Sequence, residues 1–382
     1  MKCRNLISFD SGDFASYHYR TKGNCMLNRR DFTIGAAGAV SLGATGLNAL
    51  AAESATQKAL IIDAMGEIRE VYTDSLCREM IESGLNSVTV TLCDPKSYEA
   101  EAYAWAMDGV LEYNRLIEKE SEFWMKATSV ADIQKARDAG KIALFYLFQN
   151  STQFGKDLDN VDVFYGLGVR SSQITYNYQN WAGAGCNELA GSGLTVFGHK
   201  LVEKMNSIGM LIDLSHANMQ TMADTIAASS DPVIVSHSCC KALYEHNRNT
   251  TDENLRAIAD KGGLFGVTQM RPFMTRQIDD AVHFYYQHIE HAIDVAGIDH
   301  VCIGSDRDHR RLVLTEEYLA ELKREEGENF DRAEWPLYFE ELNGPRRMET
   351  IWDGLTKRGM SEGELEKVFG LNLLRLYSEV ID

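Results

Sequence analysis

Short apolar runs alternate with amphipathic stretches eight times after residue 59, and this alternation constrains the fold more than any other feature. Most of the runs are apolar at every position, as expected for parallel strands that are covered on both faces. Eight strand–helix units favour an α/β fold closed into a (β/α)8 barrel over an open sheet. The chain of 382 residues is long enough for one such barrel. The expected strands are Leu60–Asp63, Ser87–Leu92, Ile142–Phe148, Ser172–Thr175, Met210–Leu214, Val233–Ser236, Leu264–Thr268 and Val301–Ser305.

Helical patterns lie between the expected strands, and several of them end at a glycine just before the next strand. Glycine is the usual residue after a helix because it adopts positive φ without steric cost. The helices expected on this pattern include Leu76–Ser83, Val130–Ala139, Phe197–Ser207 and Leu255–Lys261, and the glycines are Gly84, Gly140, Gly209 and Gly262.

Polar side chains follow the expected strands directly, at the strand ends where barrel enzymes carry their active sites. One buried histidine after a strand is more often structural than functional. His216 and His237, however, follow the consecutive fifth and sixth strands. Neighbouring barrel strands would place both imidazoles on one rim, close enough to share a metal ion. We therefore predict a metal or catalytic site at this pair.

The N-terminal region resembles an export signal. Arg29-Arg30 followed by Asp31-Phe32 is similar to a twin-arginine signal, and an apolar run leads from there to a cleavage motif at Ala49-Leu50-Ala51. Met26 stands where such a signal would start. The alternative is a surface helix with a chance arginine pair. We expect an extension and signal over residues 1–51, a single barrel domain over 52–382, and export to the periplasm or the extracellular space. The Gly-rich apolar run is too weak for a stable membrane span.

The net charge of −18 argues against two classes of partner. Binding to nucleic acid requires a basic face, and docking on anionic lipid requires basic clusters. We expect neither. The eight cysteines form no CxxC pair and are too sparse for a disulfide scaffold.

Several long motifs stand out in the segments 193–198, 205–216, 232–238, 246–252, 262–263, 300–306 and 370–375. They include both histidine motifs, the strand-eight motif and a helix near the C-terminus. Together they resemble the membrane (renal) dipeptidases, peptidase family M19, and the resemblance covers about residues 59–378.

The resemblance implies a barrel of the metal-dependent hydrolase kind that holds two zinc ions and cleaves dipeptides. In the family pattern, strands five and six each supply a histidine for the second metal. An arginine past strand six holds the substrate carboxylate, and an aspartate ending strand eight handles protons. The chain keeps these four residues as His216, His237, Arg248 and Asp306.

Four other positions depart from the family pattern. There, strand one ends in His-x-Asp, which binds metal, and strand three supplies a glutamate that bridges the two ions. A histidine after strand four helps to polarise the scissile carbonyl. The corresponding residues here are Met65 and Glu67 around Gly66, then Gln149, and then Tyr176.

These departures predict one metal ion instead of two. The Met65 thioether is a poor zinc ligand beside hard co-ligands, and the Gln149 amide is a weak bridge because it carries no charge. We expect the first metal position to be empty or weakly filled. His216 and His237 would hold one Zn²⁺ or another divalent ion, with the Gln149 oxygen and either Glu67 or water as further ligands.

The remaining site residues have both a functional and a structural interpretation. Asp306 would take a proton from water and pass it to the leaving amine. Arg248 would clamp a substrate carboxylate, or form a salt bridge on the rim. Tyr176 would donate a hydrogen bond where the family uses histidine, or only pack there. His309 is expected to be a solvated loop residue rather than an extra ligand.

Three functions are compatible with this pattern. The first is metal-dependent hydrolysis of a dipeptide or a similar small amide with a free carboxylate. The second is hydrolysis of another amide or ester, and the third is a binding pseudoenzyme that kept the pocket without the metals. Residues 312–344 are charged and aromatic, and are expected to form an insertion over the rim. The family tends to form homodimers, which this sequence neither supports nor excludes.

The signal predicts a specific effect of mutation on export. Replacing both Arg29 and Arg30 by lysine should block export, because the twin-arginine pair is the feature that the export route recognises. Secreted wild-type protein should begin near Ala52, as read by N-terminal sequencing. An intact N-terminus on the secreted protein would contradict the cleavage site.

Overall fold

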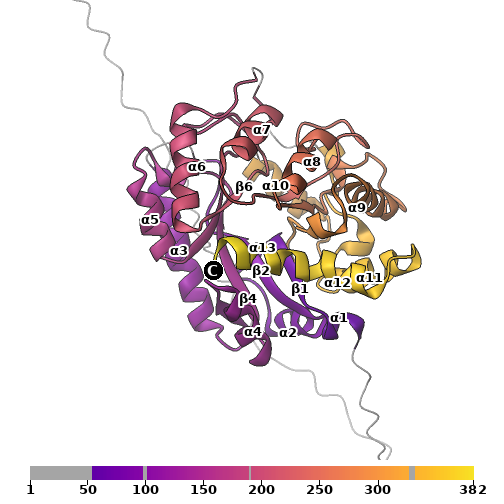
Figure 1. Cartoon of the computed structure of the whole chain (residues 1–382). Helices are drawn as coiled ribbons and strands as arrows, with labels where there is room; N and C mark the ends of the chain where they lie inside the picture. Colours follow the sequence, from indigo (N-terminus) through magenta and orange to yellow (C-terminus); the bar gives the residue numbers. More distant parts are fainter. Residues whose placement is uncertain (1–53, 98–100, 189–190, 327–331) are drawn as a thin grey trace, which may run out of the picture. The chain divides into compact units, whose positions relative to one another are not determined.

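The computed structural model describes residues 54–97, 101–188, 191–326 and 332–382, so the expected signal lies outside the described residues. The eight expected strands are all present and all parallel, which confirms the (β/α)8 barrel (Figure 1). The sheet order is β1-β2-β4-β5-β6-β7-β8-β9. The strands are β1 Ile61–Gly66, β2 Leu85–Thr91, β4 Ile142–Phe148, β5 Val169–Gln173, β6 Leu211–Asp213, β7 Ile234–Ser238, β8 Leu264–Val267 and β9 Val301–Ile303.

One further short strand, β3, was not expected from the sequence. It spans Trp124–Lys126 and pairs with the start of β4, outside the main strand order. Only Trp124 of its three residues is buried. A strand this short carries no apolar run, so its pattern gives no signal.

Several helices begin at polar caps, and four end where the glycine pattern predicts. Thr73, Thr195 and Thr251 each accept a hydrogen bond from a backbone N–H in the first turn of the helix that follows. The four glycines expected to end helices all have positive φ. The main helices are α2 Asp74–Glu82, α3 Glu101–Lys119, α4 Val130–Asp138, α5 Asp159–Gly166, α6 Val196–Ile208, α7 Met219–Ala228, α8 Asp252–Asp260, α9 Val282–Ala296, α10 Glu316–Glu326, α11 Arg347–Lys357, α12 Glu362–Glu366 and α13 Asn372–Val380.

Polar contacts join the last strand to the first. The backbone N–H of Asp306, after β9, donates to the Met65 carbonyl over 2.8 Å, and the Glu67 N–H donates to the Arg307 carbonyl over 3.1 Å. Below them, the Ser305 backbone N–H and hydroxyl both donate to the buried Asp63 carboxylate. These contacts link the two ends of the sheet and fix the loop after β9 against the end of β1.

The C-terminal helix α13 packs its apolar face on the barrel. Leu373, Leu376 and Tyr377 lie in one buried cluster with strand residues such as Ile62 and Phe145. No helix of the part of the chain that the structure describes is both long and apolar enough to span a membrane.

Arg271, after β8, attaches part of the expected rim insertion to the barrel. It is 1 % exposed, and its guanidinium donates to the carbonyls of Thr275, Gln277, Glu334 and Pro336. A buried guanidinium is stable only when its N–H groups are paired, and here carbonyls from two segments pair them. Arg271 therefore holds residues 334–336 in place.

Arg271→Met should lower the free energy of unfolding by about 3 kcal/mol, because it leaves several buried carbonyls without a donor. Chemical denaturation would measure the change. The matched control is Arg276→Met, which removes an exposed guanidinium five residues away and should change stability by less than about 0.5 kcal/mol. Equal effects of the two substitutions would refute the anchoring role.

Candidate metal and catalytic site

The two histidines predicted to share a metal lie together in the barrel. His216 follows β6, and His237 is in β7. Their Nε2 atoms are 3.1 Å apart. Burial lowers the pKa of both imidazoles well below the usual histidine value, and the nearby Arg248 guanidinium lowers both further. Both rings are therefore neutral at physiological pH.

The hydrogen bonds at the other ring nitrogens identify which nitrogen carries the proton. His216 Nδ1 lies 2.6 Å from the Asn177 side-chain oxygen, which only accepts, so His216 Nδ1 is the donor. His237 Nδ1 lies 2.8 Å from the Ser236 hydroxyl. That hydroxyl gives its own proton to Asp213, so it accepts from His237. Both Nε2 atoms then present lone pairs.

Two lone pairs that face each other across 3.1 Å repel unless a cation lies between them. Two imidazole nitrogens bound to one tetrahedral zinc ion are about 3.3 Å apart, given zinc–nitrogen bonds of about 2.0–2.1 Å. The separation of the His216 and His237 nitrogens, their neutral state and their lone pairs all fit a divalent metal ion. Hydrogen bonds at Nδ1 are the usual means of orienting such ligands.

Asp213, at the end of β6, is linked to His237 through hydrogen bonds with two serines. Its buried carboxylate accepts from the backbone N–H and hydroxyl of Ser215 and from those of Ser236. The Ser215 hydroxyl in turn accepts from the His237 backbone N–H. Asp213 was not predicted as a site residue from the sequence, although a charged residue within the apolar segment Met210–Leu214 indicates a buried carboxylate that other groups must satisfy.

Tyr176 and Arg248 lie against the histidines. The Tyr176 ring stacks on the His216 ring, with centroids 4.2 Å apart and planes at 29°. Arg248 is 6 % exposed and donates to the His237 carbonyl over 3.1 Å. Its Nε is buried without a partner, and within the described residues no carboxylate forms an ion pair with it. The guanidinium is therefore available to a ligand anion.

Asp306 is held in an unusual backbone conformation, with φ of 54°. Among residues other than glycine, this region is uncommon and is adopted mainly by asparagine, aspartate and histidine; His216 also adopts it, with φ of 67°. Such strain is common at active sites. Burial raises the pKa of its carboxyl group to about 7, against the lowering effect of Arg248. No hydrogen bond to this carboxylate is found within the described residues. A group with these properties is suited to moving protons near neutral pH.

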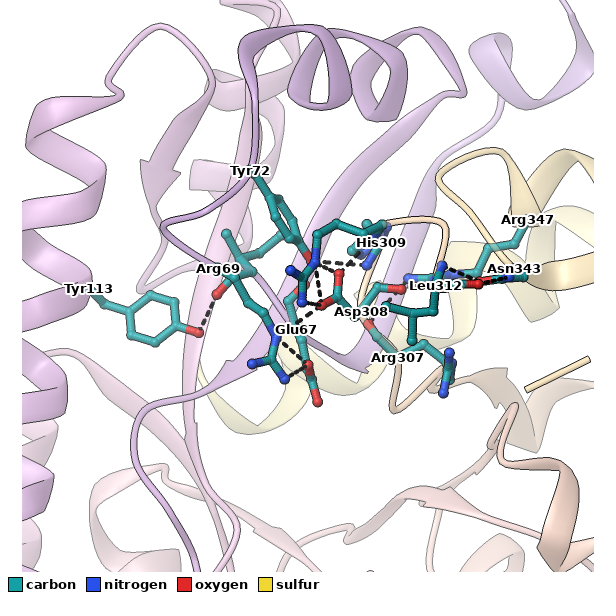
Figure 2. A network of polar contacts seen from close by, with 12 residues as sticks. Glu67, Arg69, Tyr72, Tyr113, Arg307, Asp308, His309, Leu312, Asn343 and Arg347 are labelled. Carbon is teal, nitrogen blue, oxygen red and sulfur yellow. Dashed lines mark hydrogen bonds and ion pairs between the residues drawn. The ribbon is translucent and has the colours of Figure 1, made fainter. Parts of the chain in front are cut away.

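The positions that would complete a first metal site are organised differently (Figure 2). Glu67 accepts from Arg69, and Arg69 also pairs with Asp308 over 3.1 Å. Met65 is fully buried, and Gln149 is 8 % exposed after β4. Across the described residues, no three His, Cys, Asp or Glu side chains gather in a way that could hold a metal. The assignment of Glu67 and Gln149 as ligands stays a prediction.

His309 is not the solvated loop residue that we expected. It is 1 % exposed, and neither ring nitrogen has a hydrogen-bond partner in the described structure. It lies edge-on to Tyr72, with ring centroids 6.5 Å apart. The expectation was wrong because the loop after β9 is folded inward beneath Arg347, which donates to the carbonyls of Arg307 and Asp308.

Comparisons with known proteins identify relatives over most of the chain. A dipeptidase of Clonostachys rogersoniana is 30 % identical over 267 residues, which are 69 % of this chain and 62 % of that protein. An uncharacterized protein of Klebsiella pneumoniae, encoded in the pqqA 5' region, is 34 % identical over 190 residues, 47 % of this chain and 70 % of its own length.

Among solved structures, an amidohydrolase from Pseudomonas aeruginosa is 31 % identical and superposes with a TM-score of 0.76. The match covers 85 % of this chain and 98 % of that one. The model of the membrane dipeptidase family, peptidase family M19, matches residues 63–317. That stretch contains the histidine pair, Arg248 and Asp306, and it covers more than half of the chain. The protein belongs to the membrane dipeptidase family, peptidase family M19, a family of metal-dependent hydrolases.

Proposed function

We propose that this protein hydrolyses a dipeptide, or a similar small amide with a free carboxylate, with the help of one divalent metal ion, most simply zinc. The observation that carries the proposal is the convergence of two neutral histidine lone pairs beside a guanidinium that forms no ion pair and a carboxylate without hydrogen-bond partners in the described residues. We further propose that the protein is exported before it acts, on the evidence of the signal-like N-terminus.

In this proposal, His216 and His237 hold the ion, which supplies Lewis acidity toward the substrate carbonyl and toward water. Arg248 binds the substrate carboxylate with two parallel hydrogen bonds and so orients the amide. Tyr176 takes the place of the family histidine as a hydrogen-bond donor to the carbonyl oxygen. Gln149 and Glu67 are the candidates for further ligands.

Asp306 moves the proton. It removes one proton from water as the oxygen bonds to the carbonyl carbon, and it delivers that proton to the amide nitrogen as the carbon–nitrogen bond breaks. The proton is therefore returned within the cycle, and the products are a carboxylic acid and an amine. A carboxyl group with a pKa near 7 can perform both steps at neutral pH.

The second candidate is a binding pseudoenzyme. The pairing of Glu67 with Arg69 favours it, because this carboxylate would have to leave a guanidinium in order to bind a metal. Hydrolysis of a different amide or an ester is the remaining alternative. Kinetics on a panel of dipeptides and simple esters would test it.

The first test is metal content. After loading with zinc and desalting, elemental analysis should give at most about one ion per chain, because the His216–His237 pair offers two neutral nitrogen ligands whereas Met65 and Gln149 are weak ligands for a second ion. His216→Ala and His237→Ala should each abolish binding. The matched control is His300→Ala, a partly exposed histidine that donates to the Gly263 carbonyl, which should leave the content unchanged. Two tightly held ions would overturn the prediction.

The second test concerns catalysis. Asp306→Asn should lower kcat on dipeptides by about 100-fold or more, because general acid–base catalysis contributes about that much, while metal content stays near the wild-type value. The wild-type kcat/KM should fall as the pH drops, with a midpoint at or below about pH 7, since the carboxyl group must be ionised to accept a proton. Kinetics on a panel of dipeptides and simple esters would measure both effects.

The Asp306→Asn variant should remain folded. Because the pKa of Asp306 is raised in the folded state, ionisation of this carboxyl group lowers the free energy of unfolding. Above about pH 7 this destabilisation is fully present. Asparagine removes it, so the metal-free variant should be at least as stable as the metal-free wild type at pH 8 in thermal unfolding. Wild-type protein that is metal-loaded but inactive on the whole panel would favour the pseudoenzyme.

A further inference from the structure

Arg307, directly after Asp306, differs from the other buried arginines of the barrel. It is 6 % exposed, and within the described residues its guanidinium makes no hydrogen bond and no ion pair. Figure 2 shows its side chain extending away from the network formed by Glu67, Arg69 and Asp308. Its nitrogens are not among the fully buried atoms that lack a partner, so its free N–H groups can be reached by a ligand.

A structural role does not account for Arg307. Arg271 and Arg347 are buried to a similar degree, and each donates to backbone carbonyls of neighbouring loops. Those two arginines hold chain segments together. Arg307 has only the Tyr338 ring, with its guanidinium carbon 5.1 Å from the ring centroid. A ring that contacts the flat face of a guanidinium leaves the N–H groups at its edge free to bind an anion.

The nearby carboxylates of Glu67, Asp308 and Asp63 bind other groups. Glu67 is paired with Arg69, and Asp308 is paired with Arg310 and Arg69. Asp63 lies deeper and accepts from Ser305. None of these groups forms an ion pair with Arg307, so within the described residues its guanidinium has no directly bound carboxylate.

Arg307 and Arg248 both act on the Asp306 carboxyl group, and each opposes the rise in its pKa. The two guanidiniums therefore lie within electrostatic reach of the Asp306 carboxylate, and within the described residues neither forms an ion pair with it or with another carboxylate. One of them, Arg248, is already proposed to bind the substrate carboxylate. A substrate with a single carboxylate would leave Arg307 unpaired.

We propose that Arg307 binds a second anionic group, so that the preferred substrate of this site is a small amide with two carboxylates, such as a dipeptide that contains Asp or Glu. The inference rests on the proposed function, because it assumes that ligands enter beside Arg248 and Asp306. It adds a specificity-determining residue and a substrate class to that function.

A binding experiment tests the inference without relying on catalysis. Glutarate and pentanoate have five carbons each and differ by one carboxylate, and neither can be hydrolysed. Calorimetry on the full chain should show glutarate binding at least about 10-fold more tightly, which corresponds to roughly 1.4 kcal/mol. Arg307→Met should abolish this preference, whereas Arg248→Met should weaken the binding of both probes.

The matched control is Arg311→Met. Arg311 lies in the same loop, is largely exposed and pairs with Glu340, so its loss removes the same charge outside the site. It should keep the preference for glutarate. Arg307→Lys, which retains the charge without the planar fork, should give an intermediate preference, and it replaces the methionine variant if that variant does not fold. Equal binding of both probes to the wild type, or a preference unchanged in Arg307→Met, would overturn the inference.

Kinetics separate this inference from the proposed function. Ala-Glu and Glu-Ala should have KM values at least about 10-fold below those of Ala-Gln and Gln-Ala, in whichever stereochemistry is cleaved, and Arg307→Met should bring the ratio close to one. Cleavage without this preference contradicts only the role of Arg307. A glutarate preference without cleavage of any peptide contradicts only the proposed function.

Discussion

The candidate site depends on a carboxylate buried beneath it. Asp213 accepts four hydrogen bonds from the backbone and hydroxyl groups of Ser215 and Ser236, and through the hydroxyls of these two serines it positions His237. Its bond with the Ser236 hydroxyl makes that oxygen an acceptor, which fixes the proton of His237 on Nδ1. β6 and β7 share one backbone pair in the sheet, so side-chain bonds provide much of the alignment between them.

On the other side of the barrel, a second buried aspartate also accepts hydrogen bonds from a serine, but among the described residues no histidine pair lies above it. Asp63, in β1, accepts from the backbone N–H and hydroxyl of Ser305 after β9, as Asp213 accepts from Ser236. Burial raises the pKa of Asp63, and the Arg347 guanidinium opposes that rise. The residues above Asp63 are Met65 and Glu67, and Glu67 pairs with Arg69. The Arg69 guanidinium therefore stands beside the carboxylate at the position that binds metal in the family pattern.

The sequence predicted the barrel well because its signals are local. Apolar runs identified most of the eight main strands, and glycines that have positive φ in the structure identified helix ends. The expected strand Ser172–Thr175 overlaps β5 only at Ser172 and Gln173. Strand boundaries were less accurate: β1 extends to Gly66, past the expected end at Asp63, because Met65 remains buried in the sheet. The three-residue strand β3 was missed because it has no apolar run.

The site was predicted only in part, for a physical reason. His216 and His237 follow consecutive strands, so adjacency along the sequence implied adjacency in space. The proton of His216 is fixed by Asn177, which lies far from it in the sequence. Whether Arg307 has a hydrogen-bond partner likewise depends on which distant segments fold against it. His309 was misjudged on the same ground, since its burial depends on Arg347, nearly forty residues later. Residue identity alone does not reveal which polar groups are satisfied.

The separation of the two buried aspartates explains how one half of a metal site can change while the other persists. Asp213 and its serines lie at β6 and β7, whereas Asp63 and Ser305 lie at β1 and after β9. No hydrogen bond joins these two groups within the described residues. Substitutions at Met65 and Glu67 therefore leave the hydrogen bonds that orient His216 and His237 intact. In the one-metal site that we propose, the mouth of the barrel would carry less metal charge, and Arg69, Arg248 and Arg307 are cations that the chain itself supplies there. Binding in such a site is governed less by exchangeable ions and more by guanidinium groups, which favour planar, anionic ligands.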